Sequence, residues 1–123
     1  MNRQQLIDYV KGEFDVEADY PFDKDFQTAI FRHKNNRKWF GAIINVSADK
    51  LGIDKKQRVD ILNTKIEQML KPAILQMKGV YPAYHMNKTH WVSILFAEAN
   101  DDDTKALLDM SFELTRENKK TQK

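Results

Sequence analysis

The sequence lacks cysteine, long apolar runs and a strong net charge, and each absence excludes a class of protein. Without cysteine the chain has no disulfide, no thiol nucleophile and no thiolate ligand for zinc or an iron–sulfur cluster. The N-terminal stretch reaches polar and acidic residues at once, and no apolar segment approaches the roughly 20 residues of a membrane span. We therefore expect a cytoplasmic protein with no membrane association.

The charge is nearly balanced, with 20 lysines and arginines against 18 aspartates and glutamates. The net charge therefore does not indicate a polyanionic partner. Whether the protein has a basic surface must be judged from where the charged residues lie. The length of 123 residues predicts one domain, which we place over residues 1–116. The polar end, residues 117–123, is expected to be a disordered tail.

Apolar residues at helical spacing predict three helices. The first covers residues 2–13, and its apolar positions are Leu6, Val10 and Phe14. A last helix follows Asp101-Asp102-Asp103, because acids favour a helix N-terminus and one of them can cap it. A shorter helix is expected between these two. Pro72 must lie in its first turn or kink it, and its apolar stripe is Ile66, Met69, Leu70, Ala73, Ile74 and Met77.

Stretches rich in β-branched and aromatic residues predict the strands. Residues 26–34 and 38–47 form a first hairpin around Asn35-Asn36, residues 59–65 a third strand, and residues 91–96 a central strand that is apolar on both faces. The order of elements predicts an α+β fold of two layers. We expect an antiparallel sheet of about five strands with the N- and C-terminal helices packed on one face.

In the first hairpin, a two-residue turn pairs Arg32 with Trp39 and Lys34 with Arg37 on one face. His33 and Phe40 then occupy the other face, with Phe31 opposite Phe40. Cations beside an aromatic ring can hold phosphates and stack on a base or sugar. The alternative is a solvated turn in which Arg32 only covers Trp39 through a cation–π contact.

The run from Gly79 to Trp91 predicts a second hairpin with its turn at Asn87-Lys88. Residues that would then pair across it are Tyr84 with Trp91, His85 with His90, and Met86 with Thr89. About four to six cations over both hairpins would give weak, salt-sensitive contact with a duplex and no sequence-specific reading. The candidate nucleic-acid contacts are Arg32, Lys34, Arg37, Trp39, Asn87, Lys88 and His90.

Catalytic and metal sites are not indicated. His85 and His90 as neighbours could hold a divalent metal, but the sequence places no third ligand beside them, and a hydrogen-bonded or exposed pair is the simpler interpretation. The serines Ser47, Ser93 and Ser111 have no histidine and acid at a spacing that indicates a triad. We expect no metal, no cofactor and no enzymatic activity.

Four segments carry a family resemblance. They are Val59-Asp60-Ile61-Leu62-Asn63 through Lys65, Tyr81-Pro82-Ala83-Tyr84-His85-Met86-Asn87-Lys88 with His90-Trp91, Ser111-Phe112-Glu113-Leu114-Thr115, and Lys38-Trp39-Phe40-Gly41. Together they resemble the MmcQ/YjbR family of small bacterial proteins over roughly residues 1–116. Two departures, Phe112 where the family often has Tyr or Trp and Ile66 where Cys is expected, are packing substitutions.

The resemblance implies a fold similar to frataxin (CyaY) and to type III secretion chaperones, and a DNA-binding role through a double-wing arrangement of hairpins. The expected partner is double-stranded DNA, bound by a monomer. The alternative is a protein-interaction module that presents a sheet face or a groove to a polypeptide. A small-molecule or metal-handling enzyme is the third alternative. Frataxin-like folds also engage iron through an acidic edge, but helix capping explains Asp101, Asp102 and Asp103 better.

Overall fold

The structure is a computed structural model that describes residues 1–116. The expected tail lies outside the described residues. The elements, in chain order, are α1 (Arg3–Phe14), β1 (Ala29–Arg32), β2 (Trp39–Ser47), the 3-10 turn η1 (Ala48–Leu51), β3 (Arg58–Lys65), the 3-10 turn η2 (Gln68–Leu70), α2 (Lys71–Ile74), β4 (Val80–Pro82), β5 (Trp91–Ile94) and α3 (Asp101–Thr115).

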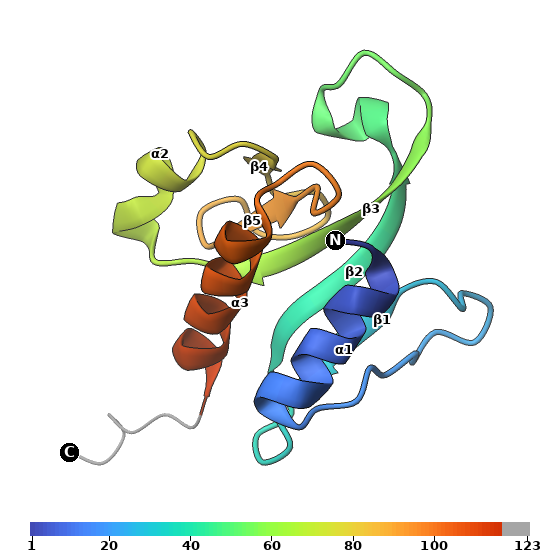
Figure 1. The fold of residues 1–123 in the computed structure, drawn as a ribbon, viewed down its shortest axis with the longest axis vertical. Helices are drawn as coiled ribbons and strands as arrows, with labels where there is room; N and C mark the ends of the chain where they lie inside the picture. Colours follow the sequence, from blue (N-terminus) through green and yellow to red (C-terminus); the bar gives the residue numbers. More distant parts are fainter. Residues whose placement is uncertain (117–123) are drawn as a thin grey trace.

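The strands form one open sheet in the order β1-β2-β3-β5-β4, and every neighbouring pair is antiparallel. Helices α1 and α3 lie on one face of this sheet (Figure 1). The α+β class, the antiparallel sheet and the placement of both terminal helices on one face are confirmed. Strand β5 lies between β3 and β4, as its apolar character on both faces predicts.

Both terminal helices begin at an asparagine cap. The Asn2 side chain accepts from the backbone N–H of Gln5, and the Gln5 side chain accepts in return from the Asn2 N–H. For α3, Asn100 accepts from two backbone N–H groups of the first turn. The expectation that one of the three aspartates caps α3 is wrong, because the preceding asparagine takes that position and the acids fill the first turn.

The main core lies between the helices and the sheet. Fully buried side chains from α1 and α3 meet apolar side chains of β1, β2 and β3, and the central members are Leu6, Val10, Leu108, Phe31, Phe40, Ile43 and Leu62. Gly41 leaves room for close packing in this layer, because a Cβ there would lie 3.0 Å from the Phe31 ring and the ring would have to shift. The opposite face, called the open face below, carries a smaller cluster centred on Val46, Leu51 and Ile61.

The first hairpin matches the sequence prediction in part. Arg32 pairs with Trp39 as expected, but a bulge between Phe31 and Arg32 places Phe31 opposite Gly41 instead of Phe40. The tip is a longer turn that ends with Arg37 in the left-handed region, at φ 64°. This tip is also attached to the end of α3, because Asn36 donates to the Thr115 carbonyl at 3.0 Å.

The second hairpin has a different register from the predicted one. Pro82 pairs with Val92, and the ladder ends there, so Tyr84 and Trp91 are not strand partners. Residues 83–90 form a loop in which His85 has a left-handed backbone, at φ 66°. Pro82 is tolerated in β4 because that strand lies at the sheet edge.

The predicted middle helix is also shorter than expected. Only the turn η2 and the one-turn helix α2 form, and Pro72 sits in the first turn of α2. The apolar stripe therefore does not pack as a unit, and Met69 is 91% exposed. Within residues 1–116, no helix has the length and apolarity that a bilayer crossing requires.

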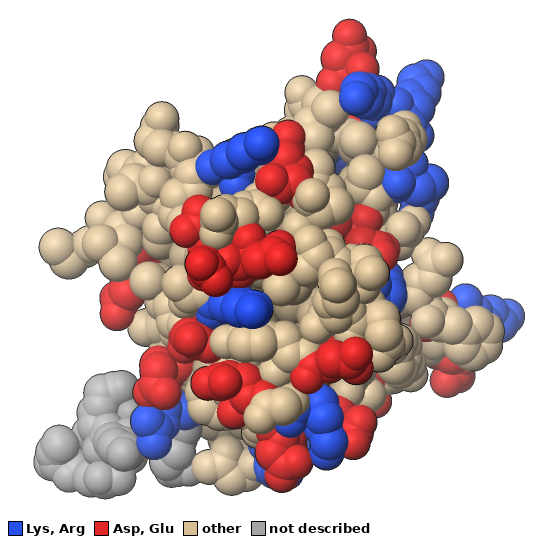
Figure 2. Space-filling model, in the orientation of Figure 1, with Lys and Arg blue, Asp and Glu red and all other residues tan. Residues whose placement is uncertain are grey.

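Charge is distributed unevenly over the molecule. In the view of Figure 2, which has the orientation of Figure 1, acidic side chains are spread over α1 and α3. Lysine and arginine gather at the upper right, over the connection from β2 to β3. That connection carries Asp49, Lys50, Asp54, Lys55 and Lys56 and runs into Arg58. A locally basic segment thus exists that the near-neutral total conceals.

Candidate nucleic-acid interface

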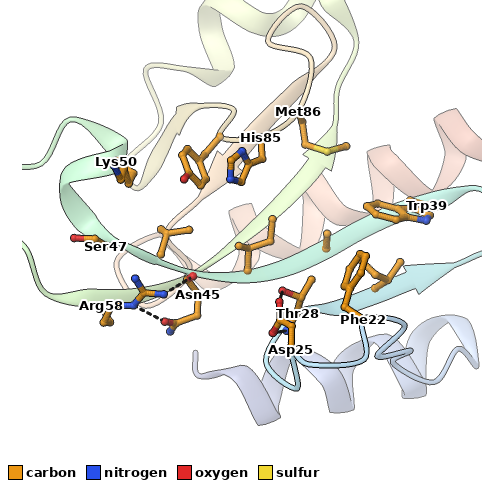
Figure 3. Close-up of a pocket in the computed structure, with 15 residues that line it drawn as sticks. Phe22, Asp25, Thr28, Trp39, Asn45, Ser47, Lys50, Arg58, His85 and Met86 are labelled. Atoms are coloured by element: carbon orange, nitrogen blue, oxygen red, sulfur yellow. Dashed lines mark hydrogen bonds between the residues drawn. The ribbon is translucent and has the colours of Figure 1, made fainter.

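The open face of the sheet has a hollow of about 430 Å³ (Figure 3). Its floor is strand β2 with a contribution from β1. Side chains alternate between the two faces of a strand, so Ala42, Ile44 and Val46 face the hollow while Ile43 faces the helices. This open-face hollow is lined by Phe22, Asp25, Thr28, Ile30, Trp39, Ala42, Ile44, Asn45, Val46, Ser47, Lys50, Arg58, Tyr84, His85 and Met86.

Aromatic side chains from three separate segments form its walls. Phe22 comes from the loop before β1 and is 44% exposed, and Trp39 begins β2. On the other side, the His85 ring lies against Tyr84 with a centroid distance of 3.9 Å, and Met86 follows it. Figure 3 shows His85 and Met86 across the β2 floor from Phe22. The hollow is therefore open but has rings on both sides.

A buried polar cluster anchors the Tyr84 wall to the sheet. Asn63 and Ser93 are fully buried on β3 and β5. The Asn63 amide donates to the Tyr84 carbonyl at 3.0 Å, the Tyr84 N–H donates to the Ser93 hydroxyl at 2.9 Å, and that hydroxyl donates to Asn63. Because buried polar groups are costly when unpaired, this cluster fixes the backbone at Tyr84.

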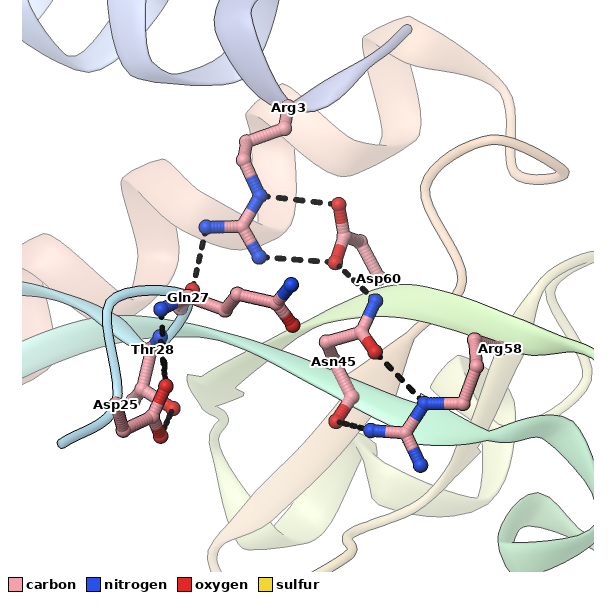
Figure 4. A network of polar contacts seen from close by, with 7 residues as sticks. All are labelled: Arg3, Asp25, Gln27, Thr28, Asn45, Arg58 and Asp60. Atoms are coloured by element: carbon pink, nitrogen blue, oxygen red, sulfur yellow. Dashed lines mark hydrogen bonds and ion pairs between the residues drawn. The ribbon is translucent and has the colours of Figure 1, made fainter.

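The loop that carries Phe22 is anchored by a polar network that joins it to α1 and β3 (Figure 4). Arg3 of α1 makes a two-pronged contact with Asp60 of β3, at 3.0 and 2.8 Å, and also donates to the Gln27 carbonyl. The hydrogen bonds from Arg3 hold the pKa of the Asp60 carboxyl below its ordinary value. Asp25 is likewise held ionised, since the Thr28 hydroxyl and two backbone N–H groups lower its pKa.

Two cations at one end of the hollow have no acidic partner among residues 1–116. Lys50 is exposed and makes no ion pair in that part of the chain. Arg58 donates only to the side chain and carbonyl of Asn45, at 2.8 and 2.9 Å, and both acceptors are neutral. In Figure 3, these two residues lie at the end of the hollow opposite Trp39. Trp39 and these two cations therefore lie at opposite ends of the open-face hollow.

The cations of the first hairpin gather as the sequence predicts, but acids face two of them. Arg32, Lys34 and Arg37 line one shallow recess together with residues 16–19. Arg32 pairs with Asp19 at 3.0 Å and Lys34 with Asp15 at 2.8 Å. Arg32 also lies over the Trp39 ring, 5.7 Å from its centroid, so the cation–π contact weighed from the sequence is present.

The predicted residues of the second hairpin shape its loop. The Asn87 side chain accepts from the Thr89 N–H at 2.8 Å, and Lys88 donates to the Ala83 carbonyl at 2.6 Å. The His90 carbonyl accepts from the Ile66 N–H at 2.8 Å, and His85 lines the hollow. The predicted pairing of His85 with His90 is wrong. In the described part of the chain, no three or more histidines and acids are grouped as metal ligands would be.

His33 has a structural role that the sequence does not reveal. Its side chain is 5% exposed, and its Nε2 lies 2.8 Å from the Thr115 hydroxyl at the end of α3. Burial lowers the pKa of the imidazole, so the neutral form is favoured. The ring packs between Phe40 and Phe112, with centroid distances of 5.1 and 4.4 Å. This contact attaches the first hairpin to the helix layer.

Several residues of the hollow could not be recognised from the sequence. Phe22, Lys50 and Arg58 lie far from the predicted turns, and only the fold brings them to Trp39 and His85. One signal was available for the floor, because β2 is apolar at consecutive positions from Ala42 to Ile44. Such a pattern indicates that both faces of a strand are covered or used.

Known proteins match this chain over nearly its whole length. The YjbR family model matches residues 14–114. The uncharacterized protein YyaQ of Bacillus subtilis is 34% identical over 117 residues, which are 94% of this chain and 99% of YyaQ.

Solved structures agree with that match. A crystal structure of a Pseudomonas syringae protein superposes with a TM-score of 0.91 at 39% identity, covering 94% of this chain and 100% of the other. Protein DR2400 of Deinococcus radiodurans, at 22% identity, has a TM-score of 0.60 over 92% of this chain and 80% of its own, so it shares the fold. By the family match and these relatives, the chain belongs to the MmcQ/YjbR family.

Proposed function

We propose that this protein binds DNA along the open face of its sheet, as a monomer and without catalysis. One observation carries the proposal. Trp39, from the first hairpin, and His85, from the second, line the same hollow, and two cations without acidic partners lie at its other end. Aromatic and basic groups on one surface are the combination that holds bases or sugars together with phosphates.

The proposed contacts differ in role. Lys50 and Arg58 neutralise phosphates beside the hollow. Arg37 and Lys88 do so at the two loops, since neither makes an ion pair in residues 1–116. Lys34 has an exposed pair with Asp15, and exposed pairs are weak enough for a phosphate to compete. Arg32 is a positioning residue that holds Trp39. Asn87 and His90 shape the backbone of the second loop. With so few cations, affinity is weak and falls with salt.

The test is a titration of a labelled duplex at low and moderate salt, with backbone amide shifts followed by NMR. Expected shifts lie in residues 32–39, 47–58 and 84–90, and affinity falls steeply with salt concentration. Lys50→Glu is expected to weaken binding and to reduce the salt dependence. Lys78→Glu is the matched control, because Lys78 is also exposed but does not line the hollow.

No binding at low salt, or shifts confined to α1 and α3, would reject the proposal. Equal losses from the two lysine variants would also reject it, because they would mean that only net charge matters. The stoichiometry of the same titration checks that one copy of the protein binds.

A protein-interaction module is the second candidate, and one observation favours it. Met69 is 91% exposed and Leu70 is 46% exposed, side by side on η2. Contiguous exposed apolar surface is a feature of protein contacts. A nuclease-treated lysate should then yield a partner that the wild-type protein captures and that Met69→Ser with Leu70→Ser does not. Identical captures by both proteins would remove this candidate.

A further inference from the structure

We infer that the open-face hollow holds one unpaired base, so that the protein binds single-stranded DNA in preference to a duplex. The inference rests on the proposed DNA-binding function and names the form of DNA that the hollow fits. It is carried by the size of the hollow, its aromatic walls, the position of its cations and the rigidity of its supports.

The size of the hollow fits a small planar group. About 430 Å³ lies within the range of roughly 300–1,000 Å³ that small-molecule sites occupy. In a duplex the faces of the bases are stacked on each other, and only the base edges reach the grooves. An unpaired base presents its flat faces and can enter a hollow between side chains.

The walls offer rings to such a base. Phe22, Trp39 and the pair Tyr84 and His85, whose rings are tilted against each other, come from three different segments and all border the same space. Phe22 is 44% exposed although it is a large apolar side chain, so part of its ring faces solvent. Stacking on aromatic side chains is the usual means of binding bases without reading their sequence.

The cations are placed for the phosphate of the same nucleotide. Lys50 and Arg58 lie at the end of the hollow away from Trp39, as Figure 3 shows. The one carboxylate among the lining residues is Asp25, and it already accepts from the Gln27 and Thr28 N–H groups and from the Thr28 hydroxyl. The hollow therefore matches a ligand that is aromatic at one end and anionic at the other.

The supports of the walls are formed without a ligand. Ser93 and Asn63 hold the Tyr84 backbone, and Arg32, itself paired with Asp19, lies over Trp39. The Phe22 loop is tied by the Arg3 contact to Gln27. A site whose walls are already ordered loses less conformational freedom when a ligand binds. Less of the stacking energy is then offset by the entropy cost of binding.

The experiment compares a labelled 12-nucleotide DNA strand with the same strand annealed to its complement. We expect the single strand to bind at least about tenfold more tightly, the scale of a single stacked base. In NMR spectra, the indole N–H signal of Trp39 should shift on addition of the single strand. The indole signal of Trp91, which does not line the hollow, serves as the internal reference.

Two phenylalanines of one loop provide the matched variants. Phe22→Ala should weaken single-strand binding about fivefold or more, whereas Phe26→Ala, at a ring that is 79% exposed but outside the hollow, should not. Neither side chain belongs to the core, so both variants should fold, and amide spectra check this.

The outcomes separate the inference from the proposed function. Equal affinity for duplex and single strand, or equal behaviour of the two phenylalanine variants, overturns the inference and leaves DNA binding standing. No binding of either DNA at low salt overturns the proposed function and the inference with it. A shift of Trp39 without a preference for the single strand also contradicts the inference, because it places a paired DNA against the hollow.

Discussion

The two faces of the sheet differ in how their charged side chains are paired and in how far their apolar side chains are buried. On the helix face, Arg3 is paired with Asp60, His33 is bonded to Thr115, and central apolar side chains such as Leu108 are fully buried. On the open face, Lys50 has no acidic partner within residues 1–116, and rings border a hollow. The Arg3–Asp60 pair therefore stabilises the helix face, whereas Lys50 remains available for an anion on the open face.

The same difference separates the first hairpin from the hollow. The hairpin has the more conspicuous basic sequence, yet Asp15 and Asp19 neutralise Lys34 and Arg32. The β2–β3 connection is less conspicuous, but its cations remain available for an anion. A basic run in a sequence is thus most available to an anion where the fold brings no acids to it.

The largest expected effect is on folding, from truncation of the helix-face core. Leu108→Ala removes a fully buried side chain of α3 and should lower the free energy of unfolding by about 3 kcal/mol. Ile44→Ala, at a half-buried position of the open face, should cost less than about 2 kcal/mol. Urea unfolding measures both. Equal losses would mean that the two faces contribute alike to stability.

The next effect concerns the charge network. Arg3→Ala leaves the Asp60 carboxylate with Asn45 as its remaining partner and should cost about 1–3 kcal/mol. The control is Lys11→Ala, whose partners Asp15 and Glu17 are exposed, and little change is expected there.

The same variant has a pH signature. Arg3 lowers the pKa of Asp60 from its ordinary 3.8, so this stabilisation is present above that pH and is lost as the pH falls through the folded-state value. The unfolding curves of wild type and Arg3→Ala should therefore converge in acid. A constant gap between them down to low pH would contradict the role given to the ion pair.

A smaller effect is expected from His33. Because burial lowers its pKa below the ordinary 6.5, the unfolded chain takes up a proton at a higher pH than the folded chain does. Stability should be complete above about pH 6.5 and should decrease as the pH falls through that value. Thermal unfolding between pH 7.5 and 5 measures the slope, which His33→Gln should reduce and His90→Gln should leave in place.

The smallest effect concerns the support of Trp39. Asp19→Asn removes the acid that holds Arg32 over the indole and should weaken single-strand binding by about two- to fivefold, the scale of an exposed cation–π contact. Glu17→Gln, in the same loop but paired with Lys11, should not change affinity. Fluorescence anisotropy at constant salt measures both. Weakening by both variants would show that Trp39 is not supported in this way.

The sequence predicts the fold well because periodicity and turns are local signals. The helix spacing of Leu6 and Val10 and the pairing of Arg32 with Trp39 follow from such signals. The bulge beside Phe31 could not be predicted, since it depends on Phe31, Gly41 and Leu108 meeting in the core. The stripe from Ile66 to Met77 has helical spacing, but the structure leaves Met69 exposed and the helix ends at Ile74.

The candidate site was predicted only where it is local. Trp39 was recognised by its place beside a turn, and it lines the hollow. The register of the second hairpin depends on Asn63, a β3 residue, which bonds the Tyr84 carbonyl through a contact between distant segments. Lys50 and Phe22 join the site only through the order of strands in the sheet. The acids that face the first hairpin lie in a loop, and a loop has no sequence periodicity from which its path could be predicted.

The measurement that tests the open face most directly is an amide-shift titration with the 12-nucleotide single strand. Shifts are expected at Trp39, Ile44 and His85 and in the Lys50 to Arg58 segment, while Leu6, Leu108 and the rest of α1 and α3 stay unchanged. Shifts centred on the helix face, with the hollow unaffected, would contradict the assignment of recognition to the open face.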